Sequence, residues 1–258
     1  MNAPRDRVRA RIDLLLNLIQ AELTARYKST SLGMLWFVLN PILTMLILVV
    51  VFQRLIRLDI ENYPVFVLTA LLPWTFFQMG FVNASGSVMR SSGLVKRVYV
   101  PRLFIPLSAI LASFVHFLVS LVVLFGFMLV LQVPFTRYLL LLPVVILIQL
   151  VFLIGAGLLG VSLSVIYRDV EHAIEPGMRI LFYLTPSFYP LSFVPEKWLG
   201  LYLSNPMAGI VAMYRAVILE GAMPSAFVVG MALCGSLVVV VLGVVAFRRA
   251  EPYFDDYV

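Results

Sequence analysis

Long apolar runs with few or no charged residues recur along this chain, and they constrain the fold more than any other feature. A helix needs about 20 mostly apolar residues to cross a hydrocarbon core of about 30 Å. We expect six membrane spans, at about Leu32–Phe52, Pro64–Val82, Leu103–Leu131, Tyr138–Ile166, Gly177–Phe193 and Ala226–Phe247. The fifth is short and is interrupted by Pro186 and Pro190.

The composition agrees with a chain that is solvated by lipid. Of the 258 residues, 62% are hydrophobic and 12% are charged, and the mean hydropathy is +1.02. Soluble domains are typically about 45–50% apolar and about 25% charged. Since so few polar residues cannot cover the surface of a soluble protein, the expected fold class is an all-α integral membrane protein, with a single transmembrane domain over residues 1–258.

The positive charges on the connecting segments predict the orientation of the chain. If the N-terminus lies in the cytoplasm, fourteen of the 19 Lys and Arg residues fall on inner segments, where membrane proteins concentrate them. The five on outer segments are Arg54, Arg57, Arg137, Lys197 and Arg215. Both termini are therefore expected on the cytoplasmic side, with an even number of spans. The net charge of +6 fits inner loops that face anionic lipid rather than nucleic acid.

Residues 5–26 precede the first span and predict an amphipathic helix that lies in the membrane interface. One helical face is apolar and carries Val8, Ile12, Leu15, Leu16, Ile19 and Leu23. The opposite face is polar and carries Arg9, Asp13, Asn17, Gln20 and Thr24. Such a helix can rest on a bilayer with its apolar side down. Packing against a soluble partner is the alternative, and the two are compatible. No cleavable signal peptide is expected, because polar residues break the run that follows the first arginines.

Two connecting segments are longer than a simple link requires. The basic segment 84–102 contains a short apolar and basic stretch, Leu94–Tyr99, and ends near Pro101, which predicts a short helix on the cytoplasmic surface. On the outer side, residues 194–224 are too short and too broken for a span. Within them Asn205 and Pro206 predict a helix start and Gly221 a helix stop. This outer segment is expected to re-enter the membrane or to lie across its outer interface.

Several kinds of chemistry are missing from the sequence. A nucleotide-binding P-loop needs Gly directly before its Lys, but Lys28, Lys96 and Lys197 follow Tyr, Val and Glu. The predicted spans contain no acidic residue beyond Glu175 at the edge of the fifth, so an ion-coupled carrier is disfavoured. His116 shares a four-residue stripe with Ser108, Ala112 and Ser120, which favours helix packing over proton transfer. No metal site is expected.

Five stretches, in order along nearly the whole chain, resemble the ABC-transporter permeases that export O-antigen and teichoic acid. They are RYKSTSLGMLWFVLNP (26–41), GLVKRVYVPR (93–102), YRDVEH (167–172), LTPSFYPLSFVP (184–195) and NPMAGIVAMYRAVILEG (205–221). The resemblance implies a homodimer with a central pore in the bacterial inner membrane. Two separate ATPase subunits, which hold ATP and magnesium, would dock beneath it. The substrate implied is a polysaccharide linked to a polyprenyl diphosphate.

The resemblance also implies roles for particular residues. Residues 84–102 would be the coupling loop, and Leu94, Val95, Lys96, Arg97, Val98 and Tyr99 would contact the ATPase. Residues 194–224 would form an outer gate. The candidates for pore or gate lining are Tyr183, Phe188, Tyr189, Trp198 and Tyr214. By position and charge, Arg26 and Lys28 are candidates to meet the lipid diphosphate at the cytoplasmic mouth. A capsule or teichoic acid permease, and a carrier driven by an ion gradient, remain as alternatives.

Overall fold

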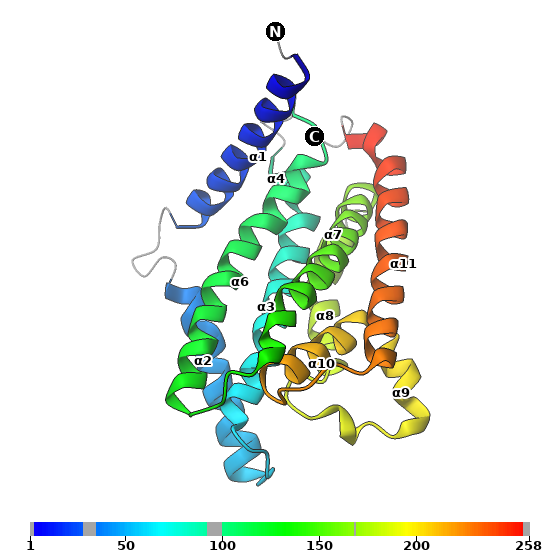
Figure 1. Cartoon of the computed structure of the whole chain (residues 1–258). Coiled ribbons are helices and arrows are strands. Elements are labelled where there is room, and N and C mark those ends of the chain that lie inside the picture. Colours follow the sequence, from blue (N-terminus) through cyan, green and yellow to red (C-terminus); the bar gives the residue numbers. More distant parts are fainter. Residues whose placement is uncertain (1–2, 28–34, 92–99, 168, 255–258) are drawn as a thin grey trace.

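The protein is a bundle of helices, and its N-terminus and C-terminus lie at the same end of the molecule (Figure 1). The computed structural model describes residues 3–27, 35–91, 100–167 and 169–254, and all regular elements within these ranges are helical. Five helical segments are long and apolar enough to cross a membrane: Val38–Leu55, Tyr63–Ser85, Phe104–Val130, Arg137–Ile166 and Ala226–Tyr253. These confirm five of the six predicted spans.

The bundle is built around α3 (Tyr63–Ser85), which is the most deeply buried of the long helices. Helix α6 (Phe104–Val130), helix α7 (Leu142–Ile166) and helix α10 (Pro206–Ile218) all pack against it. Its interface with α6 buries His116, Ser108, Ala112 and Ser120, the stripe predicted to pack between helices. Small and hydroxyl-bearing residues let helices approach closely when lipid supplies no hydrophobic driving force between them.

Helices α7 and α11 (Ala226–Ala250) form the most extensive pair, and they cross at two glycines. A Cβ atom on Gly243 would lie 2.1 Å from the backbone oxygen of Gly155, and one on Gly155 would lie 2.6 Å from Cα of Val240. Two backbones can meet this closely only where neither carries a side chain. The predicted small face of Ala156, Gly160 and Ser164 is buried as well, and Gly160 packs against Phe81 and Ser85 of α3.

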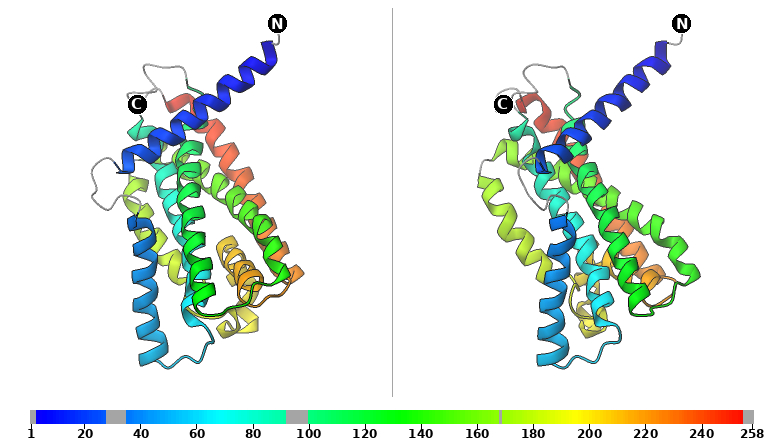
Figure 2. Two further views of the ribbon diagram at one scale, coloured as in Figure 1. Left: turned by 60° about the vertical axis from the view of Figure 1, so that its left-hand side comes forward. Right: turned by 90° about the vertical axis from the view of Figure 1, so that its left-hand side faces the viewer.

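The first span lies at the edge of the bundle. Helix α2 (Leu35–Leu48) continues as the π-helix η1 (Val49–Leu55), and only 11% of the most apolar window of this span is buried, against 72% for α3. A large apolar face of α2 and η1 is therefore left open to lipid or to another protein. Figure 2 shows this span at the edge of the bundle, apart from α7 and α11.

The predicted fifth span is wrong in its boundaries and in its length. The structure has an amphipathic helix, α8 (Asp169–Tyr183), that begins eight residues before the expected start at Gly177 and is followed by turns instead of helix up to Phe193. With 15 residues it is shorter than a full span requires, but together with the turns after it α8 carries the chain from the end of the bundle that holds the termini to the opposite end. The helix starts early because Ile174, Met178 and Phe182 share a face that packs on the bundle.

Two short helices follow between α8 and α11. Helix α9 (Glu196–Leu203) is preceded by the 3₁₀ turn η3 (Leu191–Phe193), and α10 begins as predicted, because the Asn205 side chain accepts a hydrogen bond from the Met207 amide at 3.1 Å. Gly221 has a positive φ of 57° and follows α10 as expected. The chain then enters α11, whose N-terminus is capped by Ser225 and whose C-terminus runs into the 3₁₀ turn η4 (Glu251–Tyr253).

Candidate functional site

An aromatic segment, residues 182–190, connects α8 to the short helices at the end of the bundle away from the chain termini. Phe188 lies at its centre. Its ring centroid is 5.1 Å from that of Phe52 on η1, 5.0 Å from that of Tyr189 and 6.0 Å from those of Phe182 and Tyr183. The structure therefore brings three of the predicted pore or gate residues, Tyr183, Phe188 and Tyr189, into one cluster beside the first span.

Side chains hold this segment although it lacks regular backbone pairing. The carbonyls of three consecutive residues accept hydrogen bonds from other elements: Ser187 from Arg215 Nη2 at 2.9 Å, Phe188 from the Tyr63 hydroxyl at 3.0 Å, and Tyr189 from Arg215 Nη1 at 3.0 Å. A backbone that crosses a membrane protein outside helices needs such partners for its polar groups.

Further polar contacts join the aromatic segment to α9 and α10. The Asn205 amide donates to Oγ1 of Thr185 at 3.0 Å, and the hydroxyls of Tyr189 and Tyr202 are hydrogen bonded to each other. Burial of Tyr202 and its hydrogen bond with Tyr189 raise the pKa of the Tyr202 hydroxyl far above its usual range. The Tyr202 hydroxyl consequently stays protonated at physiological pH.

The remaining two predicted gate residues lie elsewhere. Trp198 is on α9 with its ring exposed, and the Lys197 ammonium lies 5.8 Å from the ring centroid. Tyr214 is completely buried, and its hydroxyl donates to Oε1 of Gln149 on α7 at 2.7 Å. The Tyr214 side chain therefore faces the core of this chain, where it joins helices instead of lining a surface.

Sequence reasoning missed three polar residues of this region. Gln149 lies within the apolar run of α7, and Arg215 was assigned to an outer segment. Tyr63 directly precedes the predicted second span, which was expected to begin at Pro64. All three are buried and hydrogen bonded in the structure. The available signal was their isolation: one polar group in an apolar helix must find an internal partner in lipid.

Helix α8 carries a charged face next to the apolar spans. Glu171, Glu175 and Arg179 are exposed on it, and Arg179 Nη2 lies 2.9 Å from Oε1 of Glu175. Figure 2 shows α8 running lengthwise along the bundle, and it contacts α3 and α7. Charged side chains are costly in the hydrocarbon region unless they face water or protein. This face of α8 is thus a candidate lining for an aqueous passage.

At the end of the molecule that holds the termini, both sides of the predicted coupling loop are hydrogen bonded to the helices. Helix α3 runs on to Ser85, beyond the predicted loop start at residue 84, and α4 (Ser87–Arg90) follows it. Arg90 donates to the Asn83 carbonyl at 2.6 Å, and Arg102 donates to the Glu251 carbonyl at the end of α11. The predicted ATPase contacts Leu94, Val95, Lys96, Arg97, Val98 and Tyr99 lie outside the described residues.

A small hydrophobic cluster supports this loop from beneath. Val88 of α4, Ile105 of α6, Val165 of α7, Phe247 of α11 and Phe254 near the C-terminus are buried together. The rings of Phe247 and Phe254 pack edge to face with centroids 5.4 Å apart. The cluster therefore links the bases of four helices to the two ends of the coupling loop.

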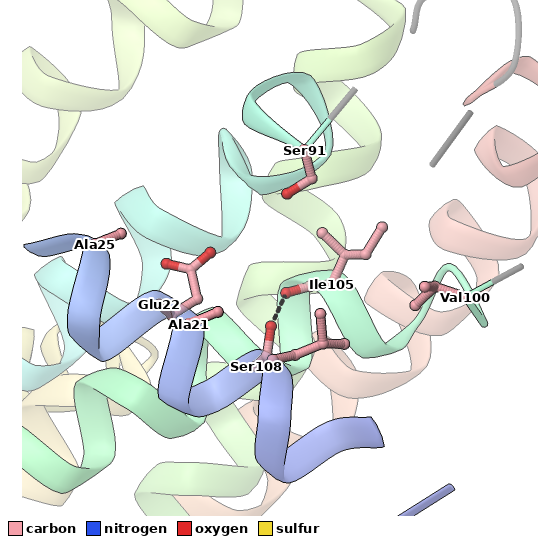
Figure 3. Close-up of a pocket in the computed structure, with 8 residues that line it drawn as sticks. Ala21, Glu22, Ala25, Ser91, Val100, Ile105 and Ser108 are labelled. Carbon is pink, nitrogen blue, oxygen red and sulfur yellow. Dashed lines mark hydrogen bonds between the residues drawn. The ribbon is translucent and has the colours of Figure 1, made fainter. Parts of the chain in front are cut away.

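Helix α1 (Ala3–Tyr27) crosses over the start of α6, and the two enclose a cavity of about 190 Å³. Figure 3 shows Glu22 of α1 between Ser91 and Ile105, with Val100 and Ser108 on the other walls. The hydroxyl of Ser108 donates to the Ile105 carbonyl at 2.8 Å and is turned toward its own helix. Ser91 and Val100 flank the coupling loop, so the predicted interface helix and that loop share this cavity.

The face of α1 turned away from the bundle is apolar in part. Val8, Ile12 and Leu16 are 57%, 52% and 57% exposed, while Leu18 lines the cavity against α6. Exposed residues on the opposite face include Asp13 and Asn17. Arg26 lies in the last turn of α1, but its side chain and the whole of Lys28 lie outside the described residues.

Among the described residues, no group of three or more His, Cys, Asp or Glu side chains is arranged to hold a metal ion. Cys234 on α11 is exposed and unpaired. His116 is buried between α6 and α3 and lies beside a cavity of only about 10 Å³, which leaves no room there for a transported solute.

Comparison with known proteins identifies the family. The profile of the ABC-2 type transporter family matches residues 13–219. The chain is 30% identical over 245 residues to the O-antigen export system permease protein RfbA of Klebsiella pneumoniae, an alignment that covers 95% of this chain and 94% of that protein. It is 34% identical over 219 residues to the O-antigen export system permease protein RfbA of Myxococcus xanthus, with 83% of each chain covered.

A more distant relative is the polysialic acid transport protein KpsM of Escherichia coli, which is 23% identical over 240 residues. The alignment covers 91% of this chain and 92% of that protein. The matched region extends from the middle of α1 to the end of α10 and so includes the coupling loop, the charged helix α8 and the aromatic segment. The chain belongs to the ABC-2 type transporter membrane family.

Proposed function

We propose that this protein is the transmembrane subunit of an ABC transporter that exports a polysaccharide of the O-antigen type across the bacterial inner membrane. The observation that carries the proposal is the charged face of α8, which runs beside apolar spans and requires water or a partner chain. The relatives named for O-antigen export match nearly the whole chain. A P-loop is missing from the sequence, so ATP and magnesium are assigned to a separate ATPase subunit.

The passage is assigned to a homodimer. The span Val38–Leu55 leaves most of its apolar surface open, and its Phe52 ring lies 5.1 Å from that of Phe188 in the segment that follows α8. A second copy that covers the apolar face would enclose the two α8 faces in a shared aqueous channel. The aromatic cluster of Tyr183, Phe188 and Tyr189 would stand at one end of that channel, where aromatic rings can stack on sugar rings.

The direction of transport follows from the orientation. The excess of Lys and Arg on segments at the end with the termini supports a cytoplasmic location for both termini. The ATPase would then dock on the coupling loop, and α9 and α10 would act as gating helices on the outer side.

Arg26 and Lys28 are proposed to bind the diphosphate of the lipid-linked substrate, because they lie at the end of the interface helix and precede the first span. Replacing both by Ala should slow polymer export, while Arg9→Ala with Arg11→Ala, on the exposed part of the same helix, should leave it unchanged. Export at the normal rate by the Arg26→Ala, Lys28→Ala variant would refute this role.

The function is tested by co-expression with a candidate P-loop ATPase subunit from the same organism. The two proteins should copurify, the complex should hydrolyse ATP, and the pair should restore surface O-antigen to a strain that lacks its own export permease. Restoration of capsule but not of O-antigen would favour the capsule alternative, in line with the polysialic acid relative. Transport that persists without ATP and depends on an ion gradient would overturn the proposal.

A further inference from the structure

A buried arginine lies at the centre of the contacts that hold the aromatic segment. Arg215 on α10 is only 4% exposed, and its Nε has no hydrogen-bond partner among the described residues. Its two terminal nitrogens donate to the carbonyls of Ser187 and Tyr189, and its Cζ lies 3.7 Å from the centre of the Phe66 ring on α3. An arginine keeps its charge in a protein, so this charge is met by two backbone dipoles, an aromatic face and the Coulomb attraction of Glu220.

A buried charge of this kind is costly unless its geometry is well satisfied. The same aliphatic and aromatic surroundings could be packed by Leu or Met without that cost. The guanidinium does what neither can do: its planar fork reaches two carbonyls that stand two residues apart, while its face lies on Phe66. Lys could occupy the site and keep the charge, but its single ammonium has no planar fork.

The carbonyl between those two is held from α3. The Tyr63 hydroxyl donates to Phe188 at 3.0 Å, and Tyr63 stacks on Phe66 with ring centroids 5.8 Å apart. Three consecutive carbonyls are thus fixed by α10 and α3. As a result, the Phe188 and Tyr189 side chains are displayed toward Phe52, Tyr183 and Tyr202.

We propose that Arg215 is a positioning residue for the gate: it makes the aromatic segment and α10 move as one body and holds the rings of Phe188 and Tyr189 in the closed arrangement. This inference rests on the proposed transport function. Arg215 is only 4% exposed and lines a cavity of about 310 Å³. It would control passive leakage, because without its two hydrogen bonds the backbone that carries the rings of Phe188 and Tyr189 would no longer be held in place.

Leakage without ATP tests the clamp apart from export. The complex with its ATPase is reconstituted into liposomes that enclose a small water-soluble dye, and no ATP or glycan is added. Native protein should retain the dye, Arg215→Met should release it severalfold faster, and Arg215→Lys should fall between them. Arg137→Met removes an exposed arginine from another loop of the chain and should match native protein.

Hydrogen exchange provides a second readout. Amides of residues 184–190 should exchange faster in Arg215→Met, while those of α6 should not change. If Arg215→Met fails to assemble, Tyr63→Phe decides the question, because it removes only the hydroxyl that holds Phe188, and a small rise in leakage is expected. A folded Arg215→Met or Tyr63→Phe complex that retains dye and exchanges like native protein would overturn the inference while leaving ATP-driven export untouched.

Discussion

The hydroxyl of Tyr214 donates a hydrogen bond of 2.7 Å to Oε1 of Gln149, and both residues are completely buried. The Gln149 amide in turn donates from Nε2 to the Pro73 carbonyl at 2.7 Å. One side chain of α7 therefore connects α10 to α3 in the middle of the bundle. Each group satisfies another that would otherwise be unpaired in an apolar interior.

Tyr214→Phe and Gln149→Leu should each lower the stability of the purified protein. Hydrogen bonds between membrane helices contribute about 0.6 kcal/mol on average and up to about 1.7 kcal/mol, so a small but measurable fall in melting temperature is expected in detergent. Because the two residues share one bond, the double variant should lose less than the sum of the single losses. Tyr167→Phe, on an exposed tyrosine, is the control, and a Tyr214→Phe protein that melts with native protein would contradict the prediction.

Gly243→Ala should push α11 away from α7. The added Cβ would meet the Gly155 backbone oxygen at 2.1 Å, and backbone, unlike a side chain, cannot rotate aside. Overpacking of this kind typically costs about 1–3 kcal/mol. Thermal unfolding and the fraction of monodisperse protein report the effect. Gly126→Ala, where a Cβ would meet nothing within 4 Å, should behave as native protein, and equal stability of the two variants would refute the interpretation.

Leu94→Asp and Tyr99→Asp should uncouple ATP hydrolysis from export, because each would bury an unpaired charge at the proposed ATPase contact. The expected result is a permease that still inserts and still folds but binds the ATPase weakly, measured by copurification and by polymer export per ATP hydrolysed. Gln132→Asp places the same charge on an exposed residue of the turn between α6 and α7, at the other end of the bundle, and should export normally. Normal ATP-driven export by the Leu94 and Tyr99 variants would exclude the coupling role.

The exposed apolar face of α1 should rest on the bilayer. In a Cys234→Ser background, a fluorescent label on Ile12→Cys should be shielded from a water-soluble quencher, while a label on Asn17→Cys, on the opposite face, should be quenched freely. Equal quenching of the two labels in liposomes would place this helix in water or against a soluble partner.

The sequence by itself determined five spans, the start of α10 at Asn205 and the turn at Gly221. Local rules suffice for these features. An uncharged run of about 20 residues has few options other than a helix in lipid, an Asn followed by Pro caps a helix, and a positive φ favours Gly. The order of five motifs also indicated the family, and the family profile confirms this prediction.

The boundaries of the fifth span were mispredicted because they were placed from hydropathy alone. Helix α8 combines exposed charged residues with a stripe of Ile174, Met178 and Phe182 that packs on the bundle, a pattern typical of an amphipathic helix. A search for that period would have started the helix before Gly177. Whether the charged face meets water or a second chain depends on neighbours that no local pattern describes.

Only the tertiary structure decided which distant residues meet. Gln149 and Tyr214 are 65 positions apart, and Arg215 reaches carbonyls 26 and 28 positions away in segments without regular structure. Gly155 and Gly243 are ordinary glycines in two apolar runs until the helices cross at them. The physical reason is the same in each case. Helix packing determines which group lies next to a buried polar side chain or next to a glycine backbone, and packing is a property of the whole bundle.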